Sequence, residues 1–251
     1  MKGFIQTLKN IWSLQELRDK IIVTLSLILV YRFASYISLP AINMAEVGNL
    51  LDHFQKQGGG KQAAGLLGLL SSFTGGAFSH ASIMALGIMP YISASIIVQL
   101  MGMAIPYLQK LQKDGESGRK KINQITRWLT IAITLVQGPG YIYNLYRTLP
   151  SSAFLLGFDS FSFLFSSVLI LTTGTIFAMW LGEKITDKGI GNGISLLIMV
   201  GILARLPQAL LQEFTSKVTN NNGGPMLLVF EIVVWLLVII ACVLLVMAVR
   251  K

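Results

Sequence analysis

The chain has 251 residues, of which 53% are hydrophobic and only 12% are charged. Soluble domains carry about 25% charged residues, so this composition excludes an ordinary soluble protein and predicts a surface that faces lipid. The net charge of +9 comes mostly from connecting segments, which is typical of membrane topology and gives no reason to expect nucleic-acid binding. One cysteine, Cys242, and two histidines exclude an intrachain disulfide and a Cys/His metal cluster within this sequence.

The first segments of the chain predict a membrane-surface helix followed by a spanning helix. Residues 1–20 are predicted to form a cytoplasmic amphipathic helix, because their apolar side chains share one helix face. The apolar segment 21–39 is predicted to be a retained span, because it is too long for a signal peptide and no cleavage site follows it. Arg32 lies inside this span, and we interpret it as a residue that snorkels or that contacts another helix.

The next segments are polar, glycine-rich and predicted to lie on the outer side. Residues 40–63 form a polar loop that contains three consecutive glycines. Residues 64–83 are mildly apolar, but their glycines and serines make them unsuitable as a span. Irregular backbone at membrane depth is stable only when it is buried in protein or lines an aqueous cavity. We therefore predict a re-entrant half-helix over 64–83.

The remainder of the chain predicts five further spans and therefore an all-α polytopic membrane protein with six transmembrane helices. These five spans lie at about 85–105, 125–146, 160–181, 193–211 and 225–249. Asn192 is predicted to be the N-cap of the span that begins at 193. Residues 212–224 form an outer turn before the sixth span.

The basic residues predict a cytoplasmic N terminus. With that orientation, 14 of the 20 Lys and Arg residues lie inside and 5 lie outside, and the remaining one is Arg32. This asymmetry follows the rule that cytoplasmic connections are enriched in Lys and Arg.

The inner connection 107–124 holds the main cluster of charges. Its GESGRKK run over 115–121 lacks the spacing of a phosphate-binding loop, and no strand precedes it. Two interpretations stay open: a solvated basic loop that fixes the topology, or a docking surface for a cytosolic partner. The candidate docking residues are Lys113, Glu116, Arg119, Lys120 and Lys121.

Three stretches are more specific than composition. They are GGAFS at 75–79 with ALGIMPYISASIIVQL at 85–100, KDGESGRKKI at 113–122, and MWLGEKITDKGIGNGIS at 179–195. In order and spacing they resemble the SecY family, the large subunit of the bacterial Sec translocon. The resemblance implies a ten-helix channel built from two five-helix halves in a clamshell. Residues 21–211 would be the first half, and 212–251 the start of the second.

The resemblance also implies roles for individual residues. An apolar pore ring would be formed by Ile88, Ile92, Ile194 and Ile198, spaced i, i+4 on two spans. The plug that seals the resting channel would include Ser72, Phe73, Gly75, Gly76, Ala77, Phe78 and Ser79. Small residues predict weak packing there, which suits a displaceable element. Half of a lateral gate would carry Ser93, Ser95 and Gln99, which can hydrogen-bond across a helix interface.

The implied function is a passive conduit for unfolded secretory chains in the bacterial inner membrane, with lateral release of hydrophobic segments into lipid. The implied partners are SecE, SecG, signal peptides, and the SecA ATPase or the ribosome. No enzymatic signature and no cofactor is predicted. Two alternatives stay open, a small-solute secondary transporter and a purely structural subunit. Predicted spans with almost no mid-membrane carboxylate disfavour the transporter.

Overall fold

The computed structural model describes residues 13–40, 42–43, 71–78, 80–149, 153–154, 161–218 and 224–249. Most of the predicted surface helix 1–20, most of the loop 40–63 and the first part of the predicted half-helix lie outside these residues. The described chain is helical: α2 (Gln15–Ser35), α6 (Met89–Ala104), α7 (Pro106–Lys113), α8 (Gly115–Thr148), α9 (Phe161–Lys188), α10 (Gly193–Val218) and α11 (Gly224–Val249). Within the described ranges there is no strand, only the isolated bridges Ser38–Ser82 and Ile42–Phe154.

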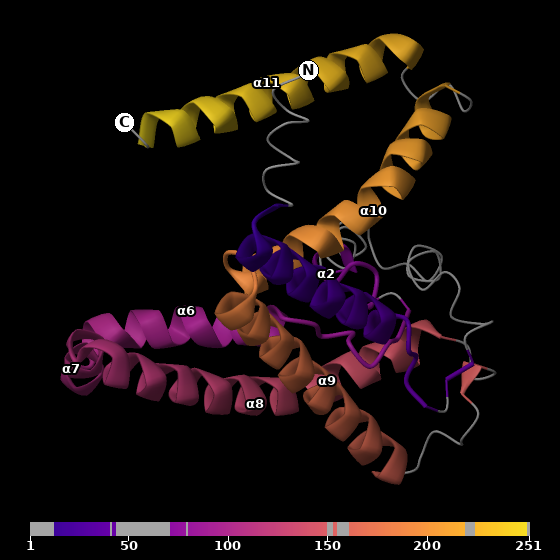
Figure 1. The fold of residues 1–251 in the computed structure, drawn as a ribbon. Helices are drawn as coiled ribbons and strands as arrows, with labels where there is room; N and C mark the ends of the chain where they lie inside the picture. Colours follow the sequence, from indigo (N-terminus) through magenta and orange to yellow (C-terminus); the bar gives the residue numbers. More distant parts are fainter. Residues whose placement is uncertain are drawn as a thin grey trace. The chain divides into compact units, whose positions relative to one another are not determined.

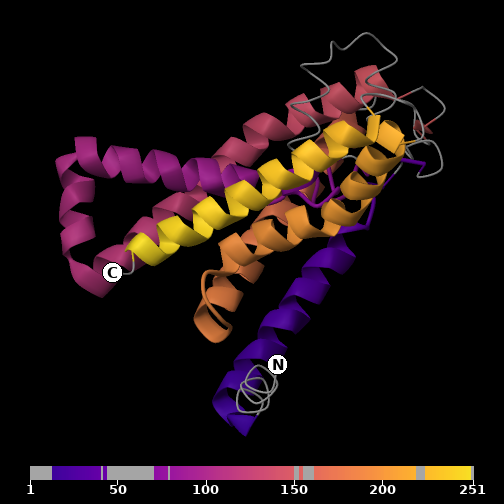
Figure 2. The ribbon, with the colours of Figure 1, turned by 90° about the horizontal axis from the view of Figure 1, so that it is seen from above.

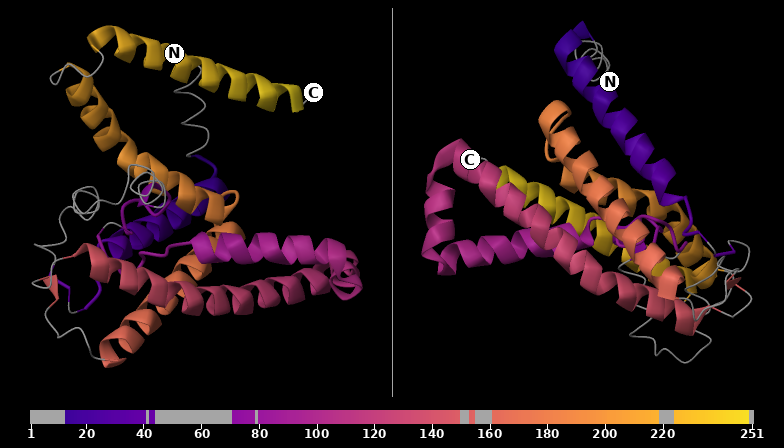
Figure 3. Two further views of the ribbon diagram at one scale, coloured as in Figure 1. Left: turned by 180° about the vertical axis from the view of Figure 1, so that it is seen from behind. Right: turned by 90° about the horizontal axis from the view of Figure 1, so that it is seen from below.

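The chain divides into two compact units, Met1–Leu203 and Ala204–Lys251. In the first unit α6 and α8 lie side by side and antiparallel, with α7 joining them at one end (Figures 1 and 2). Helix α9 crosses α8, and α2 packs on α9 (Figures 1 and 3). The second unit contains the C-terminal part of α10 and all of α11.

The connection that was predicted as a loop over 107–124 is helical, so that prediction was wrong. Helix α7 makes an angle of 103° with α6. The backbone of Ile105 is extended because Pro106 follows it, and proline disfavours helical geometry in the residue before it. Leu108 and Leu111, three residues apart, are buried in this connection, where α7 packs on α8. The sequence analysis missed this short apolar face because charged residues surround the two leucines.

Helices α9 and α10 confirm apolar elements long enough to cross a membrane. Within the described residues, Phe161–Lys188 and Gly193–Leu211 satisfy length and hydropathy, and the bent pair α6 and α7 would make a third span. Helix α2 runs from Gln15 to Ser35 instead of 21–39, and its earlier start puts Glu16 in its first turn. Helix α8 starts with charged turns and carries Gln137 and Asn144 further along. The chain is therefore a helical membrane protein, and the number of six spans stays a prediction.

The connections predicted to be cytoplasmic meet at one end of the first unit. The Thr24 hydroxyl of α2 accepts a hydrogen bond of 3.1 Å from the Ile190 amide after α9. The Arg127 guanidinium of α8 forms a bidentate ion pair with Glu183 of α9, with distances of 3.0 and 2.6 Å. Segments predicted to be outer also pair with one another, as in the Ile42–Phe154 bridge.

Candidate functional site

A turn-rich segment, residues 71–88, lies inside the first unit and covers most of the predicted plug. We call it the plug segment. Its described residues are helical at 71–73 and otherwise form turns and one bridge, at Ser82, before α6 begins at Met89, so this described part is not the predicted half-helix. Gly75 and Gly76 have φ values of 64° and 96°, which end the helical stretch. Ser79 and residues 64–70 lie outside the described residues.

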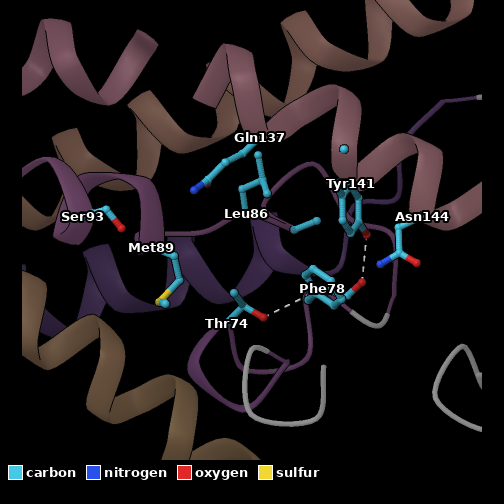
Figure 4. Close-up of a pocket in the computed structure, with 10 residues that line it drawn as sticks. Thr74, Phe78, Leu86, Met89, Ser93, Gln137, Tyr141 and Asn144 are labelled. Atoms are coloured by element: carbon cyan, nitrogen blue, oxygen red, sulfur yellow. Dashed lines mark hydrogen bonds between the residues drawn. The ribbon is translucent and has the colours of Figure 1, made fainter. Parts of the chain in front are cut away.

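Two side chains from other helices hold the plug segment by its main chain. The Arg32 guanidinium of α2 donates a hydrogen bond of 3.1 Å to the carbonyl of Gly75. The Tyr141 hydroxyl of α8 donates one of 2.8 Å to the carbonyl of Phe78, and the two rings meet edge to face at 4.9 Å (Figure 4). Arg32 was predicted to snorkel or to contact another helix, and its hydrogen-bond partner lies instead in a turn.

The plug segment also packs closely against neighbouring backbone. A Cβ added to Gly201 of α10 would lie 2.8 Å from the Phe73 carbonyl oxygen, and one added to Gly174 of α9 would collide with the Ile83 carbonyl. Ala77 is 1% exposed. The segment is therefore tightly seated, contrary to the weak packing predicted from its small residues.

Three of the four predicted pore-ring residues share one apolar cluster. Ile88, which is the N-cap of α6, is buried there, and Ile92 and Ile194 pack against it partly buried. The Ile92 amide donates to the Ile88 carbonyl at 3.1 Å, so the two residues are one helical turn apart. Ile198 is half-buried and is not among the residues of this cluster.

The same cluster contains Ala77, which was predicted as a plug residue, and three residues that sequence reasoning missed. These three are Met84 of the plug segment, Tyr31 of α2 and Leu197 of α10. The only signal in the sequence was their apolar character, which most residues of the spans share. The cluster therefore brings the plug segment against Ile88, Ile92 and Ile194.

The predicted gate residues of α6 point to different surroundings. Ser93 lines a cavity of about 280 Å³ between the plug segment, α6 and α8, together with Thr74, Gln137 and Asn144 (Figure 4). Ser95 and Gln99 lie outside this cavity, where the Gln99 amide donates to the Ser95 hydroxyl at 3.3 Å. Of the three predicted gate residues, Ser93 therefore lines the cavity, whereas Ser95 and Gln99 do not.

The predicted docking residues lie on helices and not on a loop. Lys113 ends α7, whereas Glu116, Arg119, Lys120 and Lys121 are in the first two turns of α8. All five are exposed, and Lys120 pairs with Glu116 at 3.2 Å. Beside them is a cavity of about 530 Å³ with charged walls. Its lining includes Glu116, Arg119, Lys120, Arg127, Glu183, Asp187 and Ile194.

The fold and this site define a class: a helical membrane protein with a turn-rich segment seated against an apolar cluster. The SecY family model matches residues 82–251. The chain is 43% identical over 198 residues to the protein translocase subunit SecY of Escherichia coli strain K12, which covers 79% of this chain and 43% of that protein. The chain belongs to the SecY family, which confirms the resemblance.

Other relatives agree with this assignment. The protein translocase subunit SecY of Haemophilus influenzae is 43% identical over 220 residues, which is 88% of this chain and 47% of that protein. The one from Aquifex aeolicus is 39% identical over 227 residues, covering 90% and 51%. The chain thus spans about half the length of these curated relatives.

Proposed function

We propose that this chain supplies part of a protein-conducting channel that passes unfolded secretory chains across the bacterial inner membrane. The observation that carries the proposal is the apolar cluster of Ile88, Ile92 and Ile194 against the plug segment. Bulky apolar side chains block ions by dewetting, yet they offer a passing polypeptide no specific polar partner. We include Ile198 in the proposed ring because it lies four residues after Ile194 in the sequence.

The architecture we propose is the first five-helix half of a ten-helix clamshell, followed by the sixth span. Hydrogen bonds join the segments at the predicted inner ends of α2, α8 and α9, and these contacts support a shared cytoplasmic face. The distribution of Lys and Arg supports an N terminus on that face. In this arrangement the plug segment fills the outer side of the ring and seals the resting channel.

Helices α6 and α8 are proposed to form one side of the lateral gate, where hydrophobic segments leave into lipid. The cavity that contains Ser93 and Gln137 supports this, because polar groups in apolar surroundings form interhelical contacts that can open and close. Ser95 and Gln99 extend the polar face of α6.

The channel is proposed to be a passive conduit and not an enzyme, so the energy for transport comes from partners. The SecA ATPase or the ribosome is the proposed cytosolic partner, and SecE and SecG are the proposed membrane partners. The exposed charges at the α7–α8 junction support a docking role there, because they face solvent at the proposed cytoplasmic end.

Site-specific photocrosslinking tests the pore assignment. A photoreactive residue would replace Ile92 in this chain, co-produced with a polypeptide that supplies the remaining length of its relatives. A stalled secretory chain is the probe. Leu169, an exposed apolar residue of α9, is the matched control position. We expect a strong adduct at Ile92 and none at Leu169.

The opposite outcome is equally clear. If the two polypeptides associate in the membrane and Ile92 gives no adduct, the pore assignment is wrong. A small-solute transporter would instead show uptake driven by an ion gradient, and a purely structural subunit would show neither activity.

A further inference from the structure

We propose that Arg32 is a positioning residue that holds the plug segment closed through the Gly75 carbonyl, and that Tyr141 anchors the same segment while it moves. This inference rests on the proposed channel function. It assigns two parts of the segment different tasks: residues 71–76 leave their seat first, and Phe78 stays in place.

The case begins with the position of Arg32 inside an apolar helix. A guanidinium in a membrane span is costly unless it has polar partners. Arg32 is half-buried, donates to the Gly75 carbonyl at 3.1 Å and lies over the Tyr36 ring at 5.7 Å. Among the described residues it takes part in no ion pair. The plug segment is therefore the hydrogen-bond partner that the charge has there.

The seat around Gly75 is shaped for glycine on both sides. Gly75 has a φ of 64°, and a Cβ on it would collide with the Arg32 guanidinium and lie 3.1 Å from the Cα of Gly201. A Cβ on Gly201 would in turn lie 2.8 Å from the Phe73 carbonyl oxygen and 3.3 Å from the Gly75 nitrogen. The Gly75 carbonyl that Arg32 reaches therefore lies where the two backbones approach closely.

The two hydrogen bonds differ in their access to water. The bond from Arg32 is partly buried, so water can take its place when the segment lifts. The bond from Tyr141 to Phe78 is fully buried and is accompanied by ring contact. Breaking the buried bond leaves polar groups unsatisfied, which is the costlier event. The Arg32 side therefore opens first.

The test measures the seat directly. Ala77→Cys places a thiol in the buried part of the segment, in a Cys242→Ser background that removes the native cysteine. The chain is produced with a polypeptide that supplies the remaining length of its relatives, and the alkylation rate of the thiol is recorded. Arg32→Gln and Gly201→Ala are the test variants, and Arg32→Lys is the conservative rescue.

Two matched controls separate a specific effect from general loosening. Arg147→Gln removes an arginine that also lies over a tyrosine ring, at 5.0 Å from the centroid of Tyr143. Gly140→Ala adds a methyl group to α8 where no atom outside the backbone of its own helix lies within 4 Å, on the wall of the cavity that Thr74 and Phe78 also line. Neither substitution removes either of the side-chain hydrogen bonds that Arg32 and Tyr141 donate to the plug segment.

We expect Arg32→Gln and Gly201→Ala to speed alkylation by about tenfold, because loss of one charge-assisted bond or of the close approach favours the open segment. Arg32→Lys should restore most of the slow rate. Unchanged rates in Gly201→Ala and Arg32→Gln would overturn the proposal, as would equal acceleration in both controls. If Arg32→Gln does not fold, the Gly201→Ala and Arg32→Lys rates decide.

Ion leak through lipid bilayers distinguishes this inference from the channel function. Faster alkylation with increased leak supports both. Faster alkylation without leak supports the role of Arg32 and contradicts the proposal that the segment seals a channel.

Discussion

Helix α9 contains two buried hydroxyl groups that have no hydrogen-bond partner among the described residues, those of Ser167 and Thr175. A nearby threonine differs: the Thr172 hydroxyl donates to the Val168 carbonyl at 2.8 Å. A buried polar group without a partner costs about 1–3 kcal/mol, whereas one bonded to its own helix costs little. The hydroxyl groups of Thr172 and Thr175 therefore differ in their effect on the stability of the fold.

Thr175→Val is expected to raise the free energy of unfolding by about 1–2 kcal/mol, because it removes the unpartnered oxygen and keeps the side-chain volume. Thr172→Val is the control and should change it by less than about 1 kcal/mol. Thermal unfolding in detergent micelles measures both. Equal effects of the two substitutions would contradict the assignment.

At the scale of single residues, the sequence indicated which side chains belong to the site but not which side chains they contact. Ile88, Ile92 and Ile194 were predicted from the resemblance, and the structure places them in one cluster. The Tyr141 contact with Phe78 joins positions 63 residues apart, and no local pattern encodes such a distance. Arg32 was recognised as unusual, yet its bond to Gly75 depends on a turn that only the folded chain defines.

The start of α10 shows how one side chain fixes the boundary of an element. The Asn192 side-chain oxygen accepts hydrogen bonds from the amides of Ile194 and Ser195 at 3.1 and 3.2 Å. This confirms the N-cap predicted from the sequence. The turn before it places the start of α10 against the end of α9, where Gly193 donates to the Thr186 hydroxyl at 2.9 Å.

Asn192→Ala is expected to lower the free energy of unfolding by about 1 kcal/mol, because two amides of the first turn of α10 lose their acceptor. Asn192→Asp keeps an acceptor at the same place and should retain most of the stability. Chemical denaturation of the two variants measures this, and identical losses would contradict a capping role.

The ion pair between α8 and α9 joins two elements near the proposed cytoplasmic surface. Arg127 is 51% exposed and Glu183 is 21% exposed, so solvent screens much of their attraction. A double-mutant cycle with Arg127→Gln and Glu183→Gln should give a coupling energy of roughly 0.5–1 kcal/mol at low salt. The coupling should fall at about 1 M salt, and a coupling independent of salt would show that packing dominates instead.

Element type was predictable for the long apolar segments, whereas boundaries and short elements were not. Helices α9 and α10 begin within a residue of the predicted starts, because their apolar runs each follow polar residues in the sequence. Helix α7 was missed, because it has eight residues and its two buried leucines are hidden among charges. The described part of the predicted half-helix is mostly turns, because Gly75 and Gly76 adopt positive φ values that end the helical stretch.

The first unit as a whole depends on one long helix that connects its two ends. Lys120 and Arg147 are both exposed on α8, and 27 residues of helix correspond to about 40 Å, which exceeds the roughly 30 Å of a bilayer core. In a Cys242→Ser background, Lys120→Cys is expected to react with a membrane-impermeant maleimide only from the cytoplasmic side. Arg147→Cys should react only from the opposite side.

Labelling of intact cells and of inverted vesicles measures this sidedness. Reaction of both cysteines from the same side would contradict the proposed topology. Reaction from the two sides in reversed order would keep α8 as a span but invert the chain.

The hydrogen bonds that Arg32 and Tyr141 donate to the plug segment are both accepted by main-chain carbonyls, those of Gly75 and Phe78. Every residue type supplies the same carbonyl, so these two hydrogen bonds do not depend on the side chains of the segment, although the Tyr141 ring also contacts the Phe78 ring. Over evolutionary time the segment can therefore exchange side chains at positions outside its glycine contacts while its seat persists. Segments of different sequence could then occupy the same seat and accept the same two hydrogen bonds.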